Sequence, residues 1–212
     1  MKRVKQCVSA AFFMFLSLSA AAHPHSFISL QTEVVAENGL LTGFKMRWTM
    51  DEITSADLLY DAGNAKPGSE IWKKLAAEVM ANVLGQHYFS ELWHNGKRVK
   101  FDNRPDGYGL ERSGHQAVLT FTLPLAKPQP LAGQTFTFST YDPTYYVDMY
   151  YDKDADFALP AAMKTICAAN MMTPKPNEKM LSYAQSLDKA DAPPEDMELG
   201  NYFAQKVRLQ CR

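Results

Sequence analysis

Two stretches of mostly alternating polar and apolar residues, joined by an Asn-Gly pair, constrain the fold of this chain more than any other feature. Residues 26–35 and 40–50 each show the period of two that is typical of a strand with one buried face. Asn38-Gly39 between them favours a two-residue hairpin turn, because both central positions of that turn need a positive φ angle. The sequence therefore predicts a long antiparallel β-hairpin.

The rest of the chain indicates further short strands, interrupted by one helical insertion. The clearest helix pattern covers 70–84, where apolar residues recur at helical spacing: Ile71, Trp72, Leu75, Val79 and Val83. A shorter helix is predicted at 51–61, strands at 88–93, 98–101, 116–125, 135–141 and 145–151, a surface helix at 180–190 and a final strand at 202–209. We expect an α+β fold, an antiparallel β-sandwich or open barrel with an inserted helical pair on one side.

The first 22 residues have the three parts of a secretory signal peptide. A basic head at residues 2–5 precedes a short apolar run at 8–18, and Ala20 and Ala22 supply the small residues of a cleavage site. The apolar run is too short for a membrane span. We therefore expect residues 1–22 to be a cleaved signal peptide, and residues 23–212 to be a single periplasmic α+β domain.

Charge and motifs argue against several classes of function. Cleavage would leave 19 basic and 23 acidic residues, a formal net charge of −4, without a basic run or a Gly-rich RNA-binding motif. No nucleic-acid partner is therefore expected. The sequence has no GxSxG, HExxH, P-loop or GxGxxG motif, and no Cys/His pair typical of a nucleophile, so no enzymatic activity is expected.

Two cysteines remain in the predicted mature chain. Cys7 lies inside the signal peptide, which leaves Cys167 and Cys211 as an even pair. In an oxidising compartment we expect these two to form a disulfide that ties the last residues to the body of the domain. The alternative, two thiolate metal ligands, has less support because neither cysteine has a CxxC partner.

The predicted mature N-terminus, His-Pro-His, is rich in nitrogen donors. Cleavage would free an α-amine on His23; that amine and the His23 imidazole can chelate one ion, and His25 projects to the same side of an extended chain. Pro24 lacks the N–H that a square-planar copper or nickel site would use, which favours a tetrahedral or open site and hence zinc. The alternative is a solvated tail with two histidines.

Three aspartates are candidate oxygen donors for the same ion. Asp142 and Asp148 lie in residues 141–152, which hold five tyrosines and three aspartates, and Asp148 shares a strand face with the tyrosines two residues before and after it. Asp51 follows the second strand of the hairpin, whose end lies beside the start of the first. The alternatives are turn capping and aromatic cross-strand packing in the tyrosine-rich segment, and an ordinary helix N-terminal charge for Asp51.

Residues 23–28 (HPHSFI), 48–52 (WTMDE) and 141–148 (YDPTYYVD), taken together in this order, resemble a ZevA-like family of small bacterial periplasmic proteins. Its members begin with His-Pro-His after a signal peptide and are typically encoded beside a nickel/cobalt-type membrane permease. The resemblance covers nearly all of the mature chain and includes residues 88–90 and 119–125. It implies the handling of a divalent ion, zinc ahead of nickel, cobalt or copper, with an inner-membrane permease as partner.

Two main hypotheses for function follow. In the first, a periplasmic component of a transport system binds the ion through His23 and His25, with Asp51, Asp142 or Asp148 as further candidate ligands, and passes it to or from the permease. In the second, an interaction module without a metal of its own docks its tyrosine-rich strand on a permease or a glycan. A copper-dependent oxidative enzyme built on the N-terminal histidine is a third and weaker hypothesis.

Overall fold

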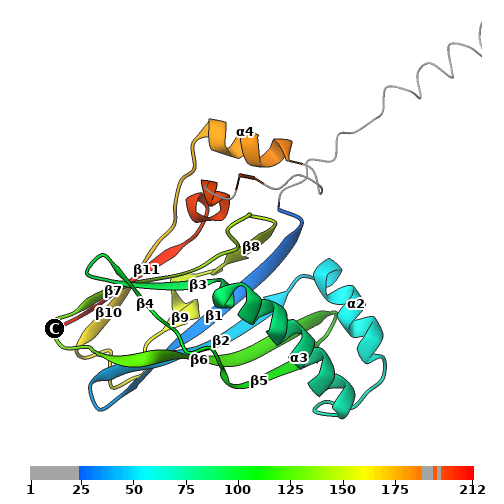
Figure 1. Cartoon of the computed structure of the whole chain (residues 1–212), viewed down its shortest axis with the longest axis horizontal. Coiled ribbons are helices and arrows are strands. Elements are labelled where there is room, and N and C mark those ends of the chain that lie inside the picture. Colours follow the sequence, from blue (N-terminus) through cyan, green and yellow to red (C-terminus); the bar gives the residue numbers. More distant parts are fainter. Residues whose placement is uncertain (1–23, 188–192, 195–196) are drawn as a thin grey trace, which may run out of the picture.

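The computed structural model describes residues 24–187, 193–194 and 197–212, which form an α+β fold with strands in two sheets (Figure 1). In chain order the elements are β1 (Ser26–Glu37), β2 (Leu40–Met50), α2 (Glu52–Ala62), α3 (Glu70–Gly85), the 3₁₀ turn η1 (His87–Phe89), β3 (Ser90–His94), β4 (Lys97–Val99), β5 (Asp106–Ser113), β6 (Gln116–Pro130), β7 (Thr135–Thr140), β8 (Val147–Tyr150), η2 (Asp154–Asp156), β9 (Phe157–Ala158), β10 (Cys167–Met172), α4 (Glu178–Ser186), η4 (Leu199–Tyr202) and β11 (Lys206–Cys211). The predicted fold class is confirmed as a two-sheet arrangement with a helical insertion.

The first sheet is built around the predicted hairpin. Its strand order is β5-β6-β2-β1-β8, and β9 also pairs with β1. β1 and β2 are antiparallel from Ile28, opposite Met50, to the turn. Asn38 and Gly39 at that turn have φ angles of 52° and 76°, the positive values that the tight hairpin requires. The hairpin prediction is confirmed.

One edge of the first sheet is mixed, because β8 and β9 run parallel to β1. Ser26 lies opposite Val147 and Ser29 lies opposite Tyr150. Parallel strands need a long crossover connection, and here the chain between β1 and β8 passes through both helices of the insertion and several strands of both sheets. The sequence patterns did not indicate this pairing, which places the tyrosine-rich segment beside the start of β1.

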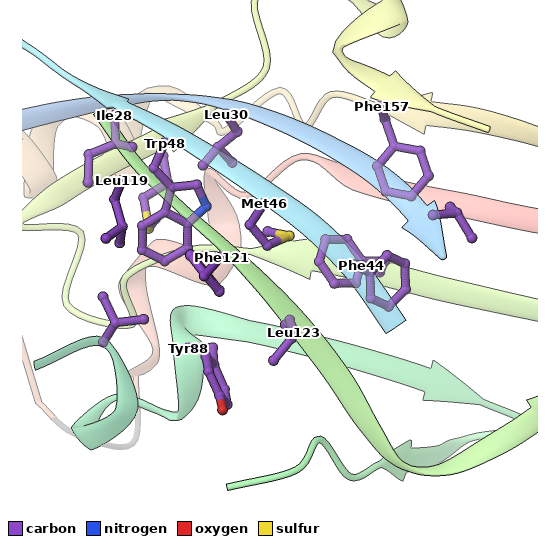
Figure 2. Close-up of a cluster of buried hydrophobic side chains, with 14 of the residues drawn as sticks. Ile28, Leu30, Phe44, Met46, Trp48, Tyr88, Leu119, Phe121, Leu123 and Phe157 are labelled. Atoms are coloured by element: carbon purple, nitrogen blue, oxygen red, sulfur yellow. The ribbon is translucent and has the colours of Figure 1, made fainter. Parts of the chain in front are cut away.

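The core lies between the two sheets. The second sheet has the order β10-β11-β7-β3-β4, and its Phe138 stacks on Phe44 of the first sheet with ring centroids 4.3 Å apart. Trp48 packs edge-on against Phe121 at 5.1 Å, and Figure 2 shows these side chains in one continuous cluster with Phe157. Burial of each large apolar side chain contributes about 1.5–3 kcal/mol, so this cluster is the main source of stability.

The second sheet and the inserted helices cover the same face of the first sheet. The helices lie at its β5–β6 end (Figure 1). The buried side of α3 carries Trp72, Leu75 and Met80, which belong to the core cluster. Most of the buried residues of α3 follow the helical spacing that predicted the helix, although Ile71 is exposed and Val79 only partly buried. The prediction of a helical pair on one side is confirmed.

The last strand is joined to the second sheet by the predicted disulfide. Cys167 and Cys211 lie directly opposite each other in the antiparallel pair β10–β11 and form a disulfide across 44 residues of sequence. The predicted pairing is confirmed. A disulfide of this kind fits an oxidising, extracytoplasmic compartment.

Several element boundaries differ from the predictions. The strand predicted at 88–93 begins only at Ser90, because residues 87–89 all have positive φ angles and form a left-handed turn. The final strand begins at Lys206, because residues 199–202 form a 3₁₀ turn. β5 and β10 were not predicted, since β5 is a largely exposed edge with two glycines and β10 is also an edge. Helix α4 ends at Ser186, and residues 188–190 of the predicted helix lie outside the described residues.

Within the described ranges, none of the helices is both long and apolar enough to cross a membrane.

Candidate functional site

The start of β1 lies between the end of β2 and the start of β8. The backbone N–H of His25 donates to the carbonyl oxygen of Tyr146 at 2.9 Å, and the N–H of Asp51 donates to the carbonyl oxygen of Phe27 at 2.9 Å. In the parallel pair, Phe27 lies opposite Asp148. The predicted proximity of the first strand's start to the second strand's end is therefore confirmed. Three predicted site residues, His25, Asp51 and Asp148, come from neighbouring strands at one end of the sheet.

Asp51 joins helix α2 to β1. Its Oδ1 accepts the backbone N–H of Thr54 at 2.8 Å, as an N-cap does, and its Oδ2 accepts the N–H of Phe27 at 2.6 Å and the Thr54 hydroxyl at 2.7 Å. Burial raises the pKa of the Asp51 carboxyl, but the hydrogen bonds from Thr54 and Phe27 outweigh it and hold the pKa below its ordinary value. Both oxygens of this charged carboxylate are engaged in holding the local structure.

Asp142 organises the loop that leads into β8. Its carboxylate accepts both the N–H and the hydroxyl of Thr144 at 2.9 Å and the N–H of Val147 at 3.0 Å. The side chain is buried, and the loop rests on Gly200, whose N–H donates to the carbonyl oxygen of Pro143 at 3.0 Å. The turn-capping role that the sequence left open describes this aspartate, whose hydrogen bonds fix the entry of the chain into β8.

Asp148 differs from the other two aspartates because desolvation dominates its environment. It is half-buried on β8, and burial raises the pKa of its carboxyl. Tyr150, two residues on in β8, shares its strand face, while Met149 is buried in the core, as the alternation predicted. A half-buried carboxylate whose charged form is disfavoured gains stability from a nearby cation.

Negative charge is concentrated around Tyr150 on this face. Burial raises the pKa of the Tyr150 hydroxyl, and the carboxylates of Asp152, Asp148 and Asp51 raise it further. The Asp152 carboxylate also accepts the Ser29 hydroxyl at 2.7 Å. Three carboxylates, two from the tyrosine-rich segment and one from the end of β2, therefore act on one tyrosine, and their combined field attracts cations to this end of the sheet.

Of the two N-terminal histidines, only His25 belongs to the described residues. The His25 ring packs against the Tyr146 ring with centroids 4.9 Å apart, whereas His23 lies outside the described residues. In the part of the chain that the structure describes, no three His, Cys, Asp or Glu side chains form a group that could hold a metal ion.

Comparison with known proteins places the chain in a family. A family model described as a protein of unknown function, DUF1007, matches residues 8–211. The chain belongs to the DUF1007 family. It is also similar to an uncharacterized protein of Haemophilus influenzae (strain ATCC 51907 / DSM 11121 / KW20 / Rd), with 42% identity over 199 residues that cover 93% of this chain and 95% of that protein. No solved structure matches the chain.

The open face of the first sheet in this DUF1007 protein also carries a polar cleft that the sequence analysis missed. The cleft has a volume of about 650 Å³ and runs over β1, β2, β5 and β6. An ion pair within it joins Lys45 to Glu33 at 3.9 Å, and Arg47, which also lines the cleft, pairs with Glu111 outside the lining at 3.1 Å. The signal was present as charged residues at alternate positions of the two hairpin strands, but the same pattern describes an ordinary solvated face.

Proposed function

We propose that this DUF1007 protein is an exported, periplasmic metal-handling component of a divalent-cation transport system. Zinc is the preferred cargo, with nickel, cobalt or copper as alternatives, and the protein passes the ion to or from an inner-membrane nickel/cobalt-type permease. The signal-peptide pattern, the His-Pro-His motif and the disulfide support export and metal handling. The observation that carries the proposal is the fixed position of His25 beside the strand of Asp148.

That position depends on hydrogen bonds on both sides of β1. The Tyr146 carbonyl oxygen holds the His25 N–H, and the Asp51 carboxylate holds the Phe27 N–H two residues on. The chain that precedes His25 therefore starts from a fixed point at the acidic end of the sheet. Cleavage after Ala22 would leave two residues before His25, and a chain of that length keeps the α-amine within reach of that point.

The available donors fit a cargo ion that is bound and released. The amine and imidazole of His23 and the imidazole of His25 are nitrogen donors suited to zinc. Asp148 is the aspartate with the best capacity to add an oxygen, because the Asp51 and Asp142 carboxylates already accept three or more hydrogen bonds each. A site at a chain end, open to solvent on one side, exchanges its ion more readily than a closed structural site.

Zinc titration of the exported protein tests this proposal. Intact mass should show a chain that begins at His23, and titration calorimetry should show one tight equivalent of zinc. The double variant His23→Ala/His25→Ala should lose that binding, and one added glycine before His23 should weaken it by removing the chelating amine. His115→Ala is the matched control, because His115 is an exposed histidine in the turn between β5 and β6, and β6 is separated from β1 by β2. Unchanged zinc affinity in the double variant would refute the metal proposal.

The interaction module remains the alternative, and one observation favours it. Phe27 on β1 and Tyr146, the residue just before the neighbouring strand β8, are 42% and 39% exposed, and large exposed aromatic side chains are typical of binding surfaces. Under this alternative, Phe27→Ala/Tyr146→Ala abolishes capture of the permease while zinc has no effect on it. Capture that requires zinc and survives the aromatic double variant would exclude the alternative.

A further inference from the structure

A second charged region lies where the chain passes from the second sheet to the first. Lys97, Arg98, Lys100 and Lys127 line a cleft of about 520 Å³, together with polar and apolar residues that include His94 and Gln129. We name these four cations the basic corner. No carboxylate lines this cleft among the described residues.

The backbone fixes the basic corner as one surface. The carbonyl oxygen of Lys100 accepts the N–H of Ala126 at 3.0 Å, and Phe101 forms a β-bridge with Leu125. These bonds hold the segment after β4 against the second half of β6. Lys100, which follows β4 of the second sheet, and Lys127, on β6 of the first sheet, are therefore held close together by backbone contacts, so their proximity is a property of the fold.

The basic corner brings together cations that have no ion-pair partner. In the rest of the described chain, four basic residues pair with glutamates, as Lys73 does with Glu70 at 2.8 Å. Of the four corner residues, Arg98 pairs with Glu91 at 3.0 Å. No carboxylate of the described residues lies within ion-pair distance of the other three. This unpaired positive charge occurs on a chain whose formal net charge is −1.

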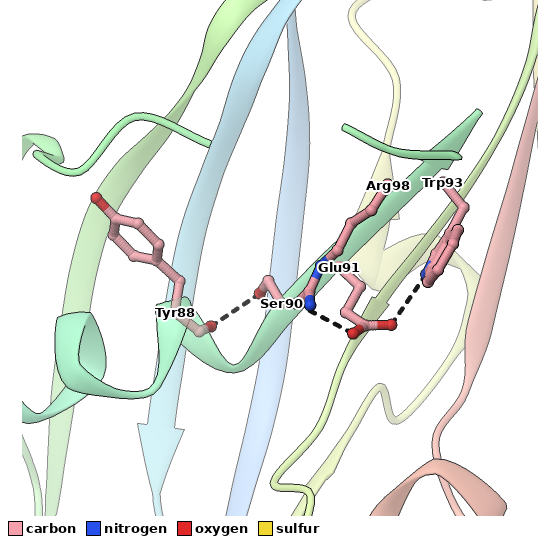
Figure 3. Close-up of polar contacts among 5 residues, drawn as sticks. All are labelled: Tyr88, Ser90, Glu91, Trp93 and Arg98. Carbon is pink, nitrogen blue, oxygen red and sulfur yellow. Dashed lines mark hydrogen bonds and ion pairs between the residues drawn. The ribbon is translucent and has the colours of Figure 1, made fainter. Parts of the chain in front are cut away.

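An exposed tryptophan borders the basic corner. Trp93 on β3 lies opposite Arg98 on β4, is 39% exposed, and donates its indole N–H to the Glu91 carboxylate at 2.9 Å. Figure 3 shows Trp93 and Arg98 on the two sides of the Glu91 side chain. Tryptophan is enriched at the interface between a membrane and water, because its ring is apolar and its N–H is polar.

We propose that the basic corner and Trp93 bind the phosphate headgroups of anionic phospholipids and seat the protein on a membrane surface. Clustered lysine and arginine side chains attract anionic lipids, and an adjacent tryptophan can enter the headgroup layer. This proposal deepens the proposed function and rests on it for the location, because a protein that serves an inner-membrane permease works next to that membrane. An acidic segment of a protein partner is the competing ligand and is an outcome of the test.

Binding to vesicles tests the proposal, with Trp93 as the probe. The chain has three tryptophans, and Trp48 and Trp72 are buried, so a change in fluorescence on vesicle addition reports mainly on Trp93. Vesicles of phosphatidylcholine with phosphatidylglycerol should bind the full mature protein and shift its emission to the blue. Pure phosphatidylcholine should bind it far more weakly, and salt at about 0.5 M should release it, because salt screens these charges.

The triple variant Lys97→Gln/Lys100→Gln/Lys127→Gln should bind about a hundredfold more weakly, since each cation near an anionic surface contributes about fivefold. The matched control is Lys66→Gln/Lys73→Gln/Lys74→Gln, which removes the same charge from exposed lysines of the helical insertion and should bind like the wild type. Equal losses in the two variants, or no loss in the triple variant, would overturn the proposal.

Two further outcomes separate this proposal from others. Binding of poly-glutamate in the absence of any vesicle binding would overturn the lipid proposal in favour of an acidic protein segment. All measurements are made in a chelator and repeated with His23→Ala/His25→Ala, which should bind vesicles like the wild type. Vesicle binding by a protein that fails the zinc titration would refute the metal function alone, and zinc binding without vesicle binding would refute the lipid site alone.

Discussion

Replacement of Asp51 by alanine is the sharpest test of how the start of β1 is held. The carboxylate accepts three hydrogen bonds that join helix α2 to β1, from the Thr54 N–H, the Thr54 hydroxyl and the Phe27 N–H. Loss of an N-cap costs about 0.5–2 kcal/mol, and loss of a further hydrogen bond near the surface costs about 1 kcal/mol. We therefore expect the free energy of unfolding to fall by about 2 kcal/mol.

Urea and thermal unfolding, followed by circular dichroism, measure this loss. For a domain of this size the melting temperature should fall by about 4–8 °C. Asp51→Asn retains one acceptor oxygen and an effective N-cap, so it should lose about half as much stability. Asp57→Ala is the control, because Asp57 is an exposed residue in the middle of the same helix and its replacement should change the stability little.

The pH dependence gives an independent check. The folded-state pKa of Asp51 lies below its ordinary value of 3.8, so its stabilising effect is complete above that value and is lost as the pH falls through the folded-state pKa. The stability difference between the wild type and Asp51→Ala should therefore be constant near neutral pH and shrink in acid below that value. A loss no larger than that of the Asp57→Ala control, or a difference that does not shrink in acid, would refute this account of the residue.

Three further predictions concern other parts of the chain. Gly200→Ala should destabilise the protein by about 1–3 kcal/mol in urea unfolding, because a Cβ atom would overlap the Asp142 carbonyl, whereas Gly85→Ala has open space and should be neutral or stabilising. Replacing both cysteines of the disulfide by serine should lower the free energy of unfolding by about 4 kcal/mol on the chain-entropy estimate for its loop, and dithiothreitol should do the same to the wild type. Asp148→Asn should stabilise the zinc-free protein near neutral pH, since burial raises the pKa of the Asp148 carboxyl and so disfavours its charged form. The stability difference from the wild type should disappear as the pH falls through the folded-state pKa to below 3.8. A stability difference that stays constant in acid would contradict this prediction.

Local patterns in the sequence were sufficient for the central hairpin, the longer inserted helix and the disulfide. The alternation of β1 and β2 and the Asn38-Gly39 turn depend on residues that are close in the chain, so their preferences act together and can be read directly. The start of β3 at Ser90 could not be predicted, because residues 87–89 adopt positive φ angles although none of them is a glycine or an asparagine.

For the candidate site too, the sequence indicated residue types but not their contacts. The sequence identified the histidines and aspartates as possible donors by residue type. It did not show that Asp51 and Asp142 are engaged by backbone N–H groups, because those hydrogen bonds form only when β1 and the loop before β8 are in place. The basic corner was also missed, since Lys100 and Lys127 belong to separate segments, each of which looks like an ordinary solvated stretch.

The sequence by itself determined which residues form the main hairpin and which face of each of its strands is buried, because these depend on residue order and a period of two. Only the tertiary structure decided that β8 lies parallel to β1 and that Asp148 faces Phe27. Backbone hydrogen bonds are alike for any partner strand, so they do not select β8, which lies more than a hundred residues from β1 in the sequence. We attribute the choice of β8 to the packing of Met149 in the shared core. That choice of partner brings the acidic, tyrosine-rich segment to the start of the first strand.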